Sequence, residues 1–359
     1  MALQDRIPVI GSTGSGGRRN YGKRTVELLG VTNLFQYRFT RSATDIARYT
    51  KEILHANPRF FVSHSGDSGV DEIVEVIMKQ MQELGPGYVP PPIFLLKGGS
   101  ANNLAEILGL SDVDYSAKLA RSLAKGEKGK KGEKRLEDYV KPTDVLKITY
   151  DDNKTVYTVT SFNIGMISQT CYGSEKGGIS AISNYFKRNG MKIITYIIEA
   201  FKASFNYHPI KADLTYTFLD DKTRITEFSN LLNMNVVNGR KHATIKEWNY
   251  KGSPCDGQLE VMCFKRMSLL KMGRIISSMI FDKEYTHLCP YHEADNYNPY
   301  NINYTENVKK LKIQVRNQSK NKRIYIEAGG NAWPIEKPDS PIKAELIPGA
   351  VNFVYGKKE

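Results

Sequence analysis

The sequence has few of the features that mark secreted, zinc-binding or membrane-spanning proteins. Its cysteines, none of which has Cys-x-x-Cys spacing, are Cys171, Cys255, Cys263 and Cys289. They are expected to be reduced thiols, and zinc is not expected. No apolar run approaches the roughly 20 residues that a membrane-spanning helix needs, and the polar start at residues 1–6 does not resemble a signal peptide. These absences favour an intracellular protein, in the cytoplasm or inside an organelle.

Acidic residues are outnumbered. The chain has 51 lysines and arginines against 38 acidic residues, a formal net charge of +13. Such an excess favours anionic partners, which include nucleotides, anionic lipid and nucleic acid, although a solubilising surface charge explains it equally well. The basic blocks 125–135 and 309–323 have the same two interpretations, solvated surface or a contact for anionic lipid headgroups.

The first part of the chain alternates between strand and helix patterns. Short apolar runs, which predict strands, lie at residues 7–10, 35–40, 59–63 and 93–96. Helical patterns follow these runs. The first ends near Leu29, the second and third lie at 45–55 and 70–84, and the fourth ends near Leu108. Such alternation predicts a parallel sheet with flanking helices, and ligands of these sheets bind at the carboxyl ends of the strands.

From about residue 140 onward, the sequence pattern changes to short runs that are typical of β-strands. The runs that predict strands lie at 145–150, 155–162, 212–218, 231–237, 259–264, 311–315, 323–327, 343–347 and 351–355. Helical patterns at 179–188, 191–204 and 268–279 interrupt them. We therefore predict an α/β domain over 1–140, with a mobile basic loop at 125–135, and a β-rich, sandwich-like domain over 141–359.

Three glycine-rich segments follow predicted strands in the α/β domain, at residues 11–17, 65–72 and 98–105. A strand that turns through glycine into a helix presents backbone N–H groups to a phosphate. Each segment taken alone is explained equally well by a plain turn. Their shared strand–loop–helix context predicts a nucleotide site, in which Asp67 orients a metal, a nucleophile or a hydroxyl.

The motifs resemble those of the diacylglycerol kinase catalytic-domain family, which is similar to the sphingosine and ceramide kinases and more distantly to the NAD kinases. Residues 65–72 resemble its Gly-Gly-Asp-Gly-Thr-x-Asn-Glu signature, and residues 98–105 resemble its Gly-Gly-Thr-Ala-Asn-Asp-Phe-Ala segment. Further matches lie at 10–16, 162–165, 238–240, 256–261 and 348–350. The match is collinear over nearly the whole chain.

This resemblance implies a nucleotide-binding α/β domain, a β-rich domain and a site in the cleft between them. The implied reaction moves the γ-phosphoryl group of ATP to a lipid hydroxyl with Mg²⁺. The implied nucleotide-binding residues are Thr40, Ser65, Gly66, Asp67, Ser68, Gly69, Val70, Asp71, Gly99 and Ser100. The implied metal site is Asp256 with backbone oxygens of Ser253 and Gln258, and its alternative is a plain turn.

The first motif departs from the family pattern. Ser65 and Ser68 stand where the family has glycine, and Gly69 replaces its threonine. We expect the loop to have shifted its glycine by one residue and kept the phosphate cradle. Asp71 replaces asparagine and brings a negative charge that should weaken polyphosphate binding. Lys97, in place of a usual proline, could supply a cation.

The largest departure lies near the C-terminus. The family has Asp-Gly-Glu there, including its usual proton acceptor, and this chain has Ala328-Gly329-Gly330. Glu327 is a candidate substitute, although an offset of one residue in a strand turns a side chain to the opposite face. Asp67 is the other candidate, because the equivalent aspartate has that role in the sphingosine kinase branch.

The first functional hypothesis is an ATP-dependent lipid kinase that acts on diacylglycerol or a related lipid at an anionic membrane surface. The alternative is a pseudokinase that binds nucleotide, lipid or a larger assembly as a scaffold. Nucleic-acid binding rests on charge alone and is a minor alternative. The oligomeric state is left open, a homo-oligomer included.

Overall fold

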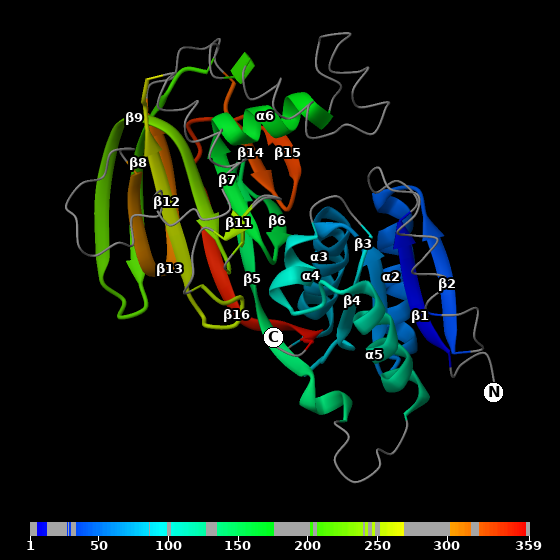
Figure 1. Cartoon of the computed structure of the whole chain (residues 1–359). Helices are drawn as coiled ribbons and strands as arrows, with labels where there is room; N and C mark the ends of the chain where they lie inside the picture. The colour runs from blue at the N-terminus through cyan, green and yellow to red at the C-terminus, as the bar shows by residue number, and fades with distance from the viewer. Residues whose placement is uncertain are drawn as a thin grey trace. The chain divides into compact units, whose positions relative to one another are not determined.

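The computed structural model describes residues 6–12, 27, 29, 34–85, 87–98, 102–126, 135–175, 202–203, 207–239, 241–242, 246–247, 252–268, 302–316 and 323–356 (Figure 1). The chain forms two compact units. Unit 1 consists of Met1–Asp144 and Pro348–Glu359, and unit 2 consists of Val145–Ile347. The sequence placed one boundary near residue 140 and did not foresee the return of the C-terminal segment to unit 1.

Unit 1 contains a parallel sheet. Its strands are β1 (Ile7–Ser12), β2 (Phe35–Thr40), β3 (Phe61–Ser65) and β4 (Ile93–Lys97). They lie in the order β4-β3-β1-β2, and each neighbouring pair is parallel. The end of β16 (Ile342–Val354) adds a further parallel strand beside β4, where Phe353 pairs with Ile93. The predicted parallel sheet is confirmed.

The helices of unit 1 follow the strands. They are α2 (Ala43–Ala56), α3 (Asp67–Leu84), α4 (Asn103–Ile107) and α5 (Val113–Lys125), and a short 3-10 helix, η2, spans Leu136–Asp138. Helix α2 begins at Ser42, whose side chain accepts from the N–H of Asp45, and ends at the left-handed Asn57. Helix α3 buries an apolar stripe that includes Ile73 and Ile77.

Helix α5 was not predicted, although its signals are present in the sequence. The side chain of Asp112 caps its first turn by accepting from the N–H of Tyr115, at 2.9 Å. The left-handed Gly126 ends the helix. Leu119 and Leu123 lie on its buried face. Lys125, which the sequence placed in a polar loop, is the last residue of this helix.

Unit 2 is built on antiparallel strands. They are β5 (Val140–Tyr150, which begins in unit 1), β6 (Lys154–Thr158), β7 (Ser161–Gly165), β8 (Ile210–Phe218), β9 (Thr223–Val237), β12 (Leu259–Lys265), β13 (Ile302–Arg316), β14 (Tyr325–Ala328) and β15 (Asn331–Pro334). The strand order is β15-β14-β7-β9-β12-β13-β16. A separate two-stranded sheet pairs β10 (Lys241–His242) with β11 (Lys246–Glu247).

The two longest strands of unit 2 each pair with both β8 and β12. Strands β9 and β13 pair with β12 along one half and with β8 along the other. Strands β8, β9, β12 and β13 therefore close a ring of hydrogen-bonded strands. Leu214, Leu231, Val261, Leu311 and Ile313 are among the buried residues of the unit's main apolar core. The predicted β-rich second part is confirmed.

Some predicted bounds differ from the structure. The run at 155–162 is split between β6 and β7, and the two runs at 343–347 and 351–355 belong to the single strand β16. Helix α6 (Met166–Glu175) follows β7 and packs against β14 and β15, and it was not predicted (Figure 1).

Several predicted features lie wholly or almost wholly outside the described residues. They are the glycine loop at 11–17, the loop at 125–135 and the helices at 179–188, 191–204 and 268–279. Within the part of the chain that the structure describes, no helix has both the length and the apolar character needed to cross a bilayer.

Candidate functional site

The candidate site lies at the carboxyl edge of the parallel sheet in unit 1. Ser12 pairs with Thr40, and Ser65 pairs with Lys97, so the strand ends lie in register at one edge. Helix α3 begins immediately after β3, with Gly66 as its N-cap in an extended conformation. A helix N-terminus at this edge presents N–H groups that have no partner within the helix.

Asp67, the first residue of α3, joins two of the glycine-rich segments. Its Oδ2 accepts from the N–H of Asn103 at 3.0 Å, and its Oδ1 accepts from the N–H of Leu104 at 3.2 Å. The carboxylate therefore holds the first turn of α4 against the first turn of α3. Burial raises the pKa of Asp67, and the two backbone hydrogen bonds act in the opposite direction.

Gly69 is required by the side chain of Ser65. A Cβ at residue 69 would lie 2.7 Å from the Cβ of Ser65 and 2.8 Å from its Oγ. The Ser65 hydroxyl is also 2.8 Å from the hydroxyl of Ser63. Gly69 itself is buried in the first turn of α3, where its N–H donates to the carbonyl of Gly66 at 3.0 Å. The glycine at 69 thus has a packing reason that does not involve a phosphate.

The second glycine-rich segment begins with a close backbone approach. A Cβ at Gly98 would lie 2.8 Å from backbone atoms of His64 and Ser65. The N–H of Gly98 donates to Oδ1 of Asn102 at 3.2 Å, and Asn102 has the left-handed φ of 53°. Gly99 and Ser100, which were predicted to bind the nucleotide, lie outside the described residues.

Lys97 and His64 flank this approach. The Nζ of Lys97 lies 3.1 Å from Oε1 of Glu106 on α4, so the predicted phosphate-binding cation already has an anionic partner. The Nε2 of His64 lies 3.1 Å from the carbonyl oxygen of Lys97, which fixes that nitrogen as the donor. Burial of the ring lowers the pKa of His64.

The remaining predicted nucleotide-binding residues lie at the end of β2 and in the first part of α3. Thr40 is buried at the end of β2, where its hydroxyl donates to the carbonyl of Gly11 at 3.3 Å, and Ser68 is half-buried in the first turn of α3. Val70 and Asp71 are buried in α3, with Asp71 5% exposed. The side chain of Asp71 is therefore enclosed by protein.

Glu327, the predicted substitute for the missing carboxylates, is a buried residue of unit 2. One of its oxygens accepts from Nδ2 of Asn163 on β7, and the other accepts from the N–H of Gly330. Gly329 and Gly330 have φ values of 55° and 91° and form the two-residue turn between β14 and β15. The carboxylate of Glu327 is therefore engaged in holding this hairpin.

The aligned position 328 is equally unsuited to a charged side chain. Ala328 is buried in the main apolar core of unit 2. The hairpin thus replaces both family carboxylates with a core alanine and a turn glycine.

The predicted metal residues come together in one exposed turn. Asp256 accepts from the N–H of Ser253 at 3.0 Å, and from the N–H and the side-chain Nε2 of Gln258 at 3.2 and 3.3 Å. The carbonyl of Ser253 accepts from the N–H of Asp256 at 3.4 Å. Across the described residues, no group of three or more His, Cys, Asp or Glu side chains could hold a metal. This donor set fits a turn closed by its own aspartate better than a built magnesium site.

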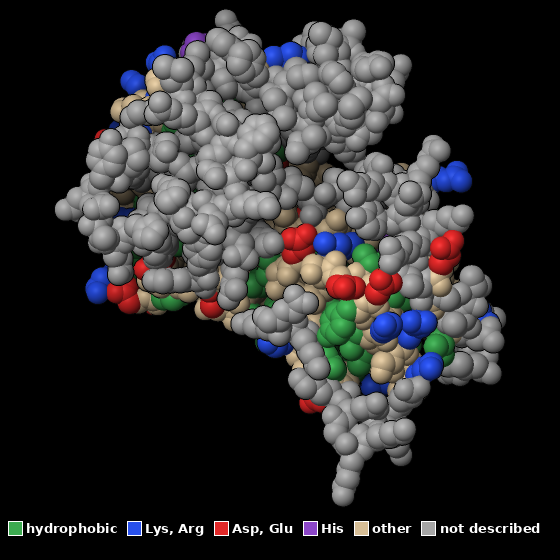
Figure 2. Space-filling model, in the orientation of Figure 1, with side chains coloured by type: hydrophobic (Ala, Val, Ile, Leu, Met, Phe, Trp, Pro, Cys, Tyr) green, Lys and Arg blue, Asp and Glu red, His purple; other side chains and the backbone are tan. Residues whose placement is uncertain are grey.

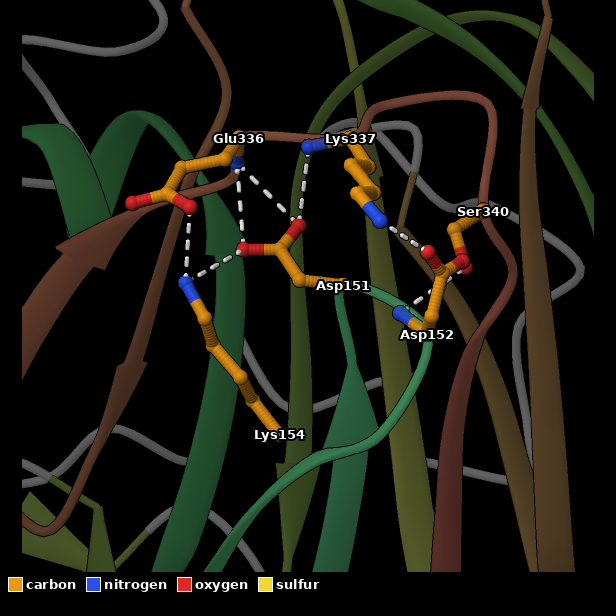
Figure 3. Close-up of polar contacts among 6 residues, drawn as sticks. All are labelled: Asp151, Asp152, Lys154, Glu336, Lys337 and Ser340. Atoms are coloured by element: carbon orange, nitrogen blue, oxygen red, sulfur yellow. Dashed lines mark hydrogen bonds and ion pairs between the residues drawn. The ribbon is translucent and has the colours of Figure 1, made fainter.

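A polar cluster in unit 2 was not foreseen from the sequence (Figure 3). The carboxylate of Asp151, in the β5–β6 turn, accepts from the N–H groups of Glu336 and Lys337 at 2.9 to 3.2 Å. Lys154 bridges Asp151 and Glu336. The Asp-Asp-Asn sequence at 151–153 signals a turn, but its distant partners have no sequence signal. The cluster joins two loops and has no feature of a reactive site.

Surface charge gives little further guidance. On the face drawn in Figure 2, basic and acidic side chains of the described residues are intermingled. The described part of that face therefore does not gather the net charge of +13 into one basic patch.

Comparison with known proteins places the fold. No protein-family model matches the chain, and no curated protein matches it. A solved structure of a protein from Bacillus anthracis strain Sterne, assigned as a diacylglycerol kinase, is 16% identical with a TM-score of 0.63 and covers 98% of each chain. A diacylglycerol kinase structure from the same strain is 16% identical with a TM-score of 0.59 and covers 98% of this chain and 97% of that chain.

The two units therefore define the class of the protein by fold: an α/β unit with a parallel sheet combined with a β-rich unit. The particular fold is that of the diacylglycerol kinases, over nearly the full length of both chains. The resemblance predicted from the motifs is confirmed at the level of the fold.

Proposed function

We propose that the chain binds ATP at the carboxyl edge of its parallel sheet and transfers the γ-phosphoryl group to a lipid hydroxyl. The observation that carries the proposal is the carboxylate of Asp67, which opens α3 and holds the start of α4. It draws two glycine-rich segments together at the edge where open α/β sheets bind ligands. The first-turn N–H groups of Asp67 and Ser68 are suited to phosphate oxygens.

The proposed reaction is a single phosphoryl transfer. The bond between the γ-phosphorus and the β-γ bridging oxygen breaks, and ADP leaves with the electron pair. A bond forms between the γ-phosphorus and the lipid oxygen, whose proton goes to Asp67. Burial raises the pKa of Asp67, and a raised pKa suits a carboxyl to this role because it makes the carboxylate a stronger proton acceptor than an ordinary aspartate. Since Asp256, the predicted metal residue, is engaged by its own turn, no step is assigned to the metal.

The acceptor in this proposal is diacylglycerol or a related lipid alcohol at an anionic membrane surface. Its support is the fold shared with proteins described as diacylglycerol kinases and the net charge of +13. A positively charged protein concentrates at an anionic surface, where its substrate would reside.

The test combines nucleotide binding with turnover. Calorimetry with ATP measures binding, and labelled ATP with a panel of lipid alcohols measures transfer. The Asp67→Asn variant should reduce transfer by roughly 10²- to 10⁴-fold, because it removes the proton acceptor and turns an amide donor toward the N–H groups that hold α4. Asp112→Asn is the matched control, since asparagine caps helix α5 as well as aspartate does. Absence of ATP binding at millimolar concentration would overturn the proposal.

A second candidate function is a scaffold that binds nucleotide without catalysis. The observation that favours it is the β14–β15 hairpin, where Glu327 is engaged with Asn163 and Gly330. ATP binding without a phosphorylated product from any lipid in the panel would select this second candidate.

A further inference from the structure

One face of the sheet in unit 2 carries a row of buried polar side chains. Glu327 on β14 pairs with Asn163 on β7, and Asn163 pairs with Asn235 on β9. Residues paired directly across strands point to the same face of a sheet. Asn163 and Asn235 are 0% exposed and Glu327 is 5% exposed. Polar groups buried this deeply are nearly always hydrogen-bonded.

Hydrogen bonds are formed at both ends of this row. At one end, the backbone N–H of Ile167, in the first turn of α6, donates to Oδ1 of Asn233 at 2.9 Å. The Nδ2 of Asn233 then donates to Oδ1 of Asn235. At the other end, the Nδ2 of Asn163 donates to the carboxylate of Glu327.

These partners fix which way each amide faces. The N–H of Ile167 requires an acceptor, so Oδ1 of Asn233 must face it, and Nδ2 of Asn233 must face Asn235. The carboxylate of Glu327 requires a donor, so Nδ2 of Asn163 must face it. No amide in the row can be reversed without placing two donors or two acceptors against each other.

Two atoms remain between these ends. They are Oδ1 of Asn163, an acceptor, and Nδ2 of Asn235, a donor, and both are buried without a hydrogen-bond partner in the described part of the chain. Leaving such groups unsatisfied is costly. Because they belong to residues paired across β7 and β9, one small group could reach both. That group must donate once and accept once, as a hydroxyl does.

We propose that Asn163 and Asn235 hold one hydroxyl group between them, either a buried water or the hydroxyl of a bound alcohol. This group completes a hydrogen-bond chain in which every member donates in the same direction, from α6 to Glu327. Aligned hydrogen bonds of this kind strengthen one another. Glu327 is then a positioning residue that ends the chain and orders the β14–β15 hairpin. The site does not depend on whether the protein transfers phosphate.

Crystals of the full chain test the site directly. We expect one ordered oxygen within hydrogen-bond distance of both Oδ1 of Asn163 and Nδ2 of Asn235. If it is present in crystals grown without any alcohol, the occupant is water. If it appears only after soaking with 1,2-dioctanoylglycerol, the occupant is an alcohol. A direct bond between the two amides, with no oxygen in either crystal, overturns the proposal.

A measurement in solution tests, without a crystal, whether the occupant is a buried water. Oxygen-17 magnetic relaxation dispersion counts long-lived internal waters, and Asn235→Leu should remove one relative to the wild-type chain. Asn230→Leu is the matched control, because Asn230 lies on the same strand and is part-exposed. If the Asn235→Leu protein does not fold, the crystals of the wild-type chain still test for the ordered oxygen between Asn163 and Asn235. An unchanged count in a folded Asn235→Leu protein, with no alcohol oxygen after the soak, also overturns the proposal.

Discussion

The side chain of Ser65 occupies the space that a Cβ on residue 69 would need. The two carbons would be 2.7 Å apart, closer than non-bonded carbons approach in proteins. Serine at residue 65 therefore requires a glycine at residue 69. Packing of α3 against the end of β3 therefore accounts for a glycine at residue 69. Whether the loop keeps a phosphate cradle stays a prediction.

Gly69→Ala should destabilise unit 1 by about 1–2 kcal/mol, since overpacking costs about 1–3 kcal/mol and exceeds the gain of about 1 kcal/mol in helix propensity. In a Ser65→Gly background the same change should become neutral or stabilising. Chemical denaturation of the four proteins of this double-mutant cycle measures the coupling. Gly87→Ala, whose Cβ would meet open space, is the control. Additive effects of the two changes would contradict the relationship.

His64 should make stability depend on pH. Because burial lowers its folded-state pKa, the unfolded chain takes up the proton first as pH falls. Its contribution is complete above the unfolded pKa of about 6.5 and is lost as pH falls from there toward the folded value, at up to about 1.4 kcal/mol per pH unit. His64→Gln should reduce this slope in denaturation curves between pH 7 and 5. The same change at exposed His55 should not, and an equal slope in both variants would refute the assignment.

Asp151 should stabilise unit 2 through backbone contacts. Asp151→Asn replaces one accepting oxygen with a donor that faces N–H groups, and a cost of about 1–3 kcal/mol is expected. Asp152→Asn is the matched control in the same turn, because Asp152 pairs with the exposed side chain of Lys337. Exposed ion pairs contribute about 0–1 kcal/mol. Thermal unfolding compares the stabilities of the two variants. A larger loss of stability from Asp152→Asn would contradict the role given to the Asp151 contacts drawn in Figure 3.

Rebuilding the family's Asp-Gly-Glu should damage the protein. Ala328→Asp places a carboxylate in the apolar core, and Gly330→Glu places a side chain at φ 91°. The first change should cost several kcal/mol and the second about 1–2 kcal/mol. We expect a lower midpoint of thermal unfolding in the double variant and no gain in transfer of labelled phosphate. A stable double variant with raised activity would show that the hairpin accommodates the family residues.

The sequence predicted the strands of the parallel sheet because each strand is a short apolar run that ends in a turn, but it did not predict their order in the sheet. It missed α5 and α6 for different reasons. Helix α5 has a clear cap at Asp112 and a left-handed glycine at its end, whereas α6 lacks a strongly amphipathic pattern. The engagement of Glu327 could not have been predicted, because its partner Asn163 lies on a strand far away in the chain. Side-chain partners across a sheet depend on register, which the sequence alone does not specify.

The segment Pro348–Glu359 follows all of unit 2 in the sequence, yet it belongs to unit 1. Its Phe353 is buried beside Ile93, and the N–H of Gly356 donates to the carbonyl of Leu108 at 2.7 Å. During translation, the sheet of unit 1 therefore cannot be completed until this segment has been made, which happens after all of unit 2. A fragment that stops at Asp144 would lack its final strand, so domain dissection of this protein requires a circular permutant or co-expression of the C-terminal segment.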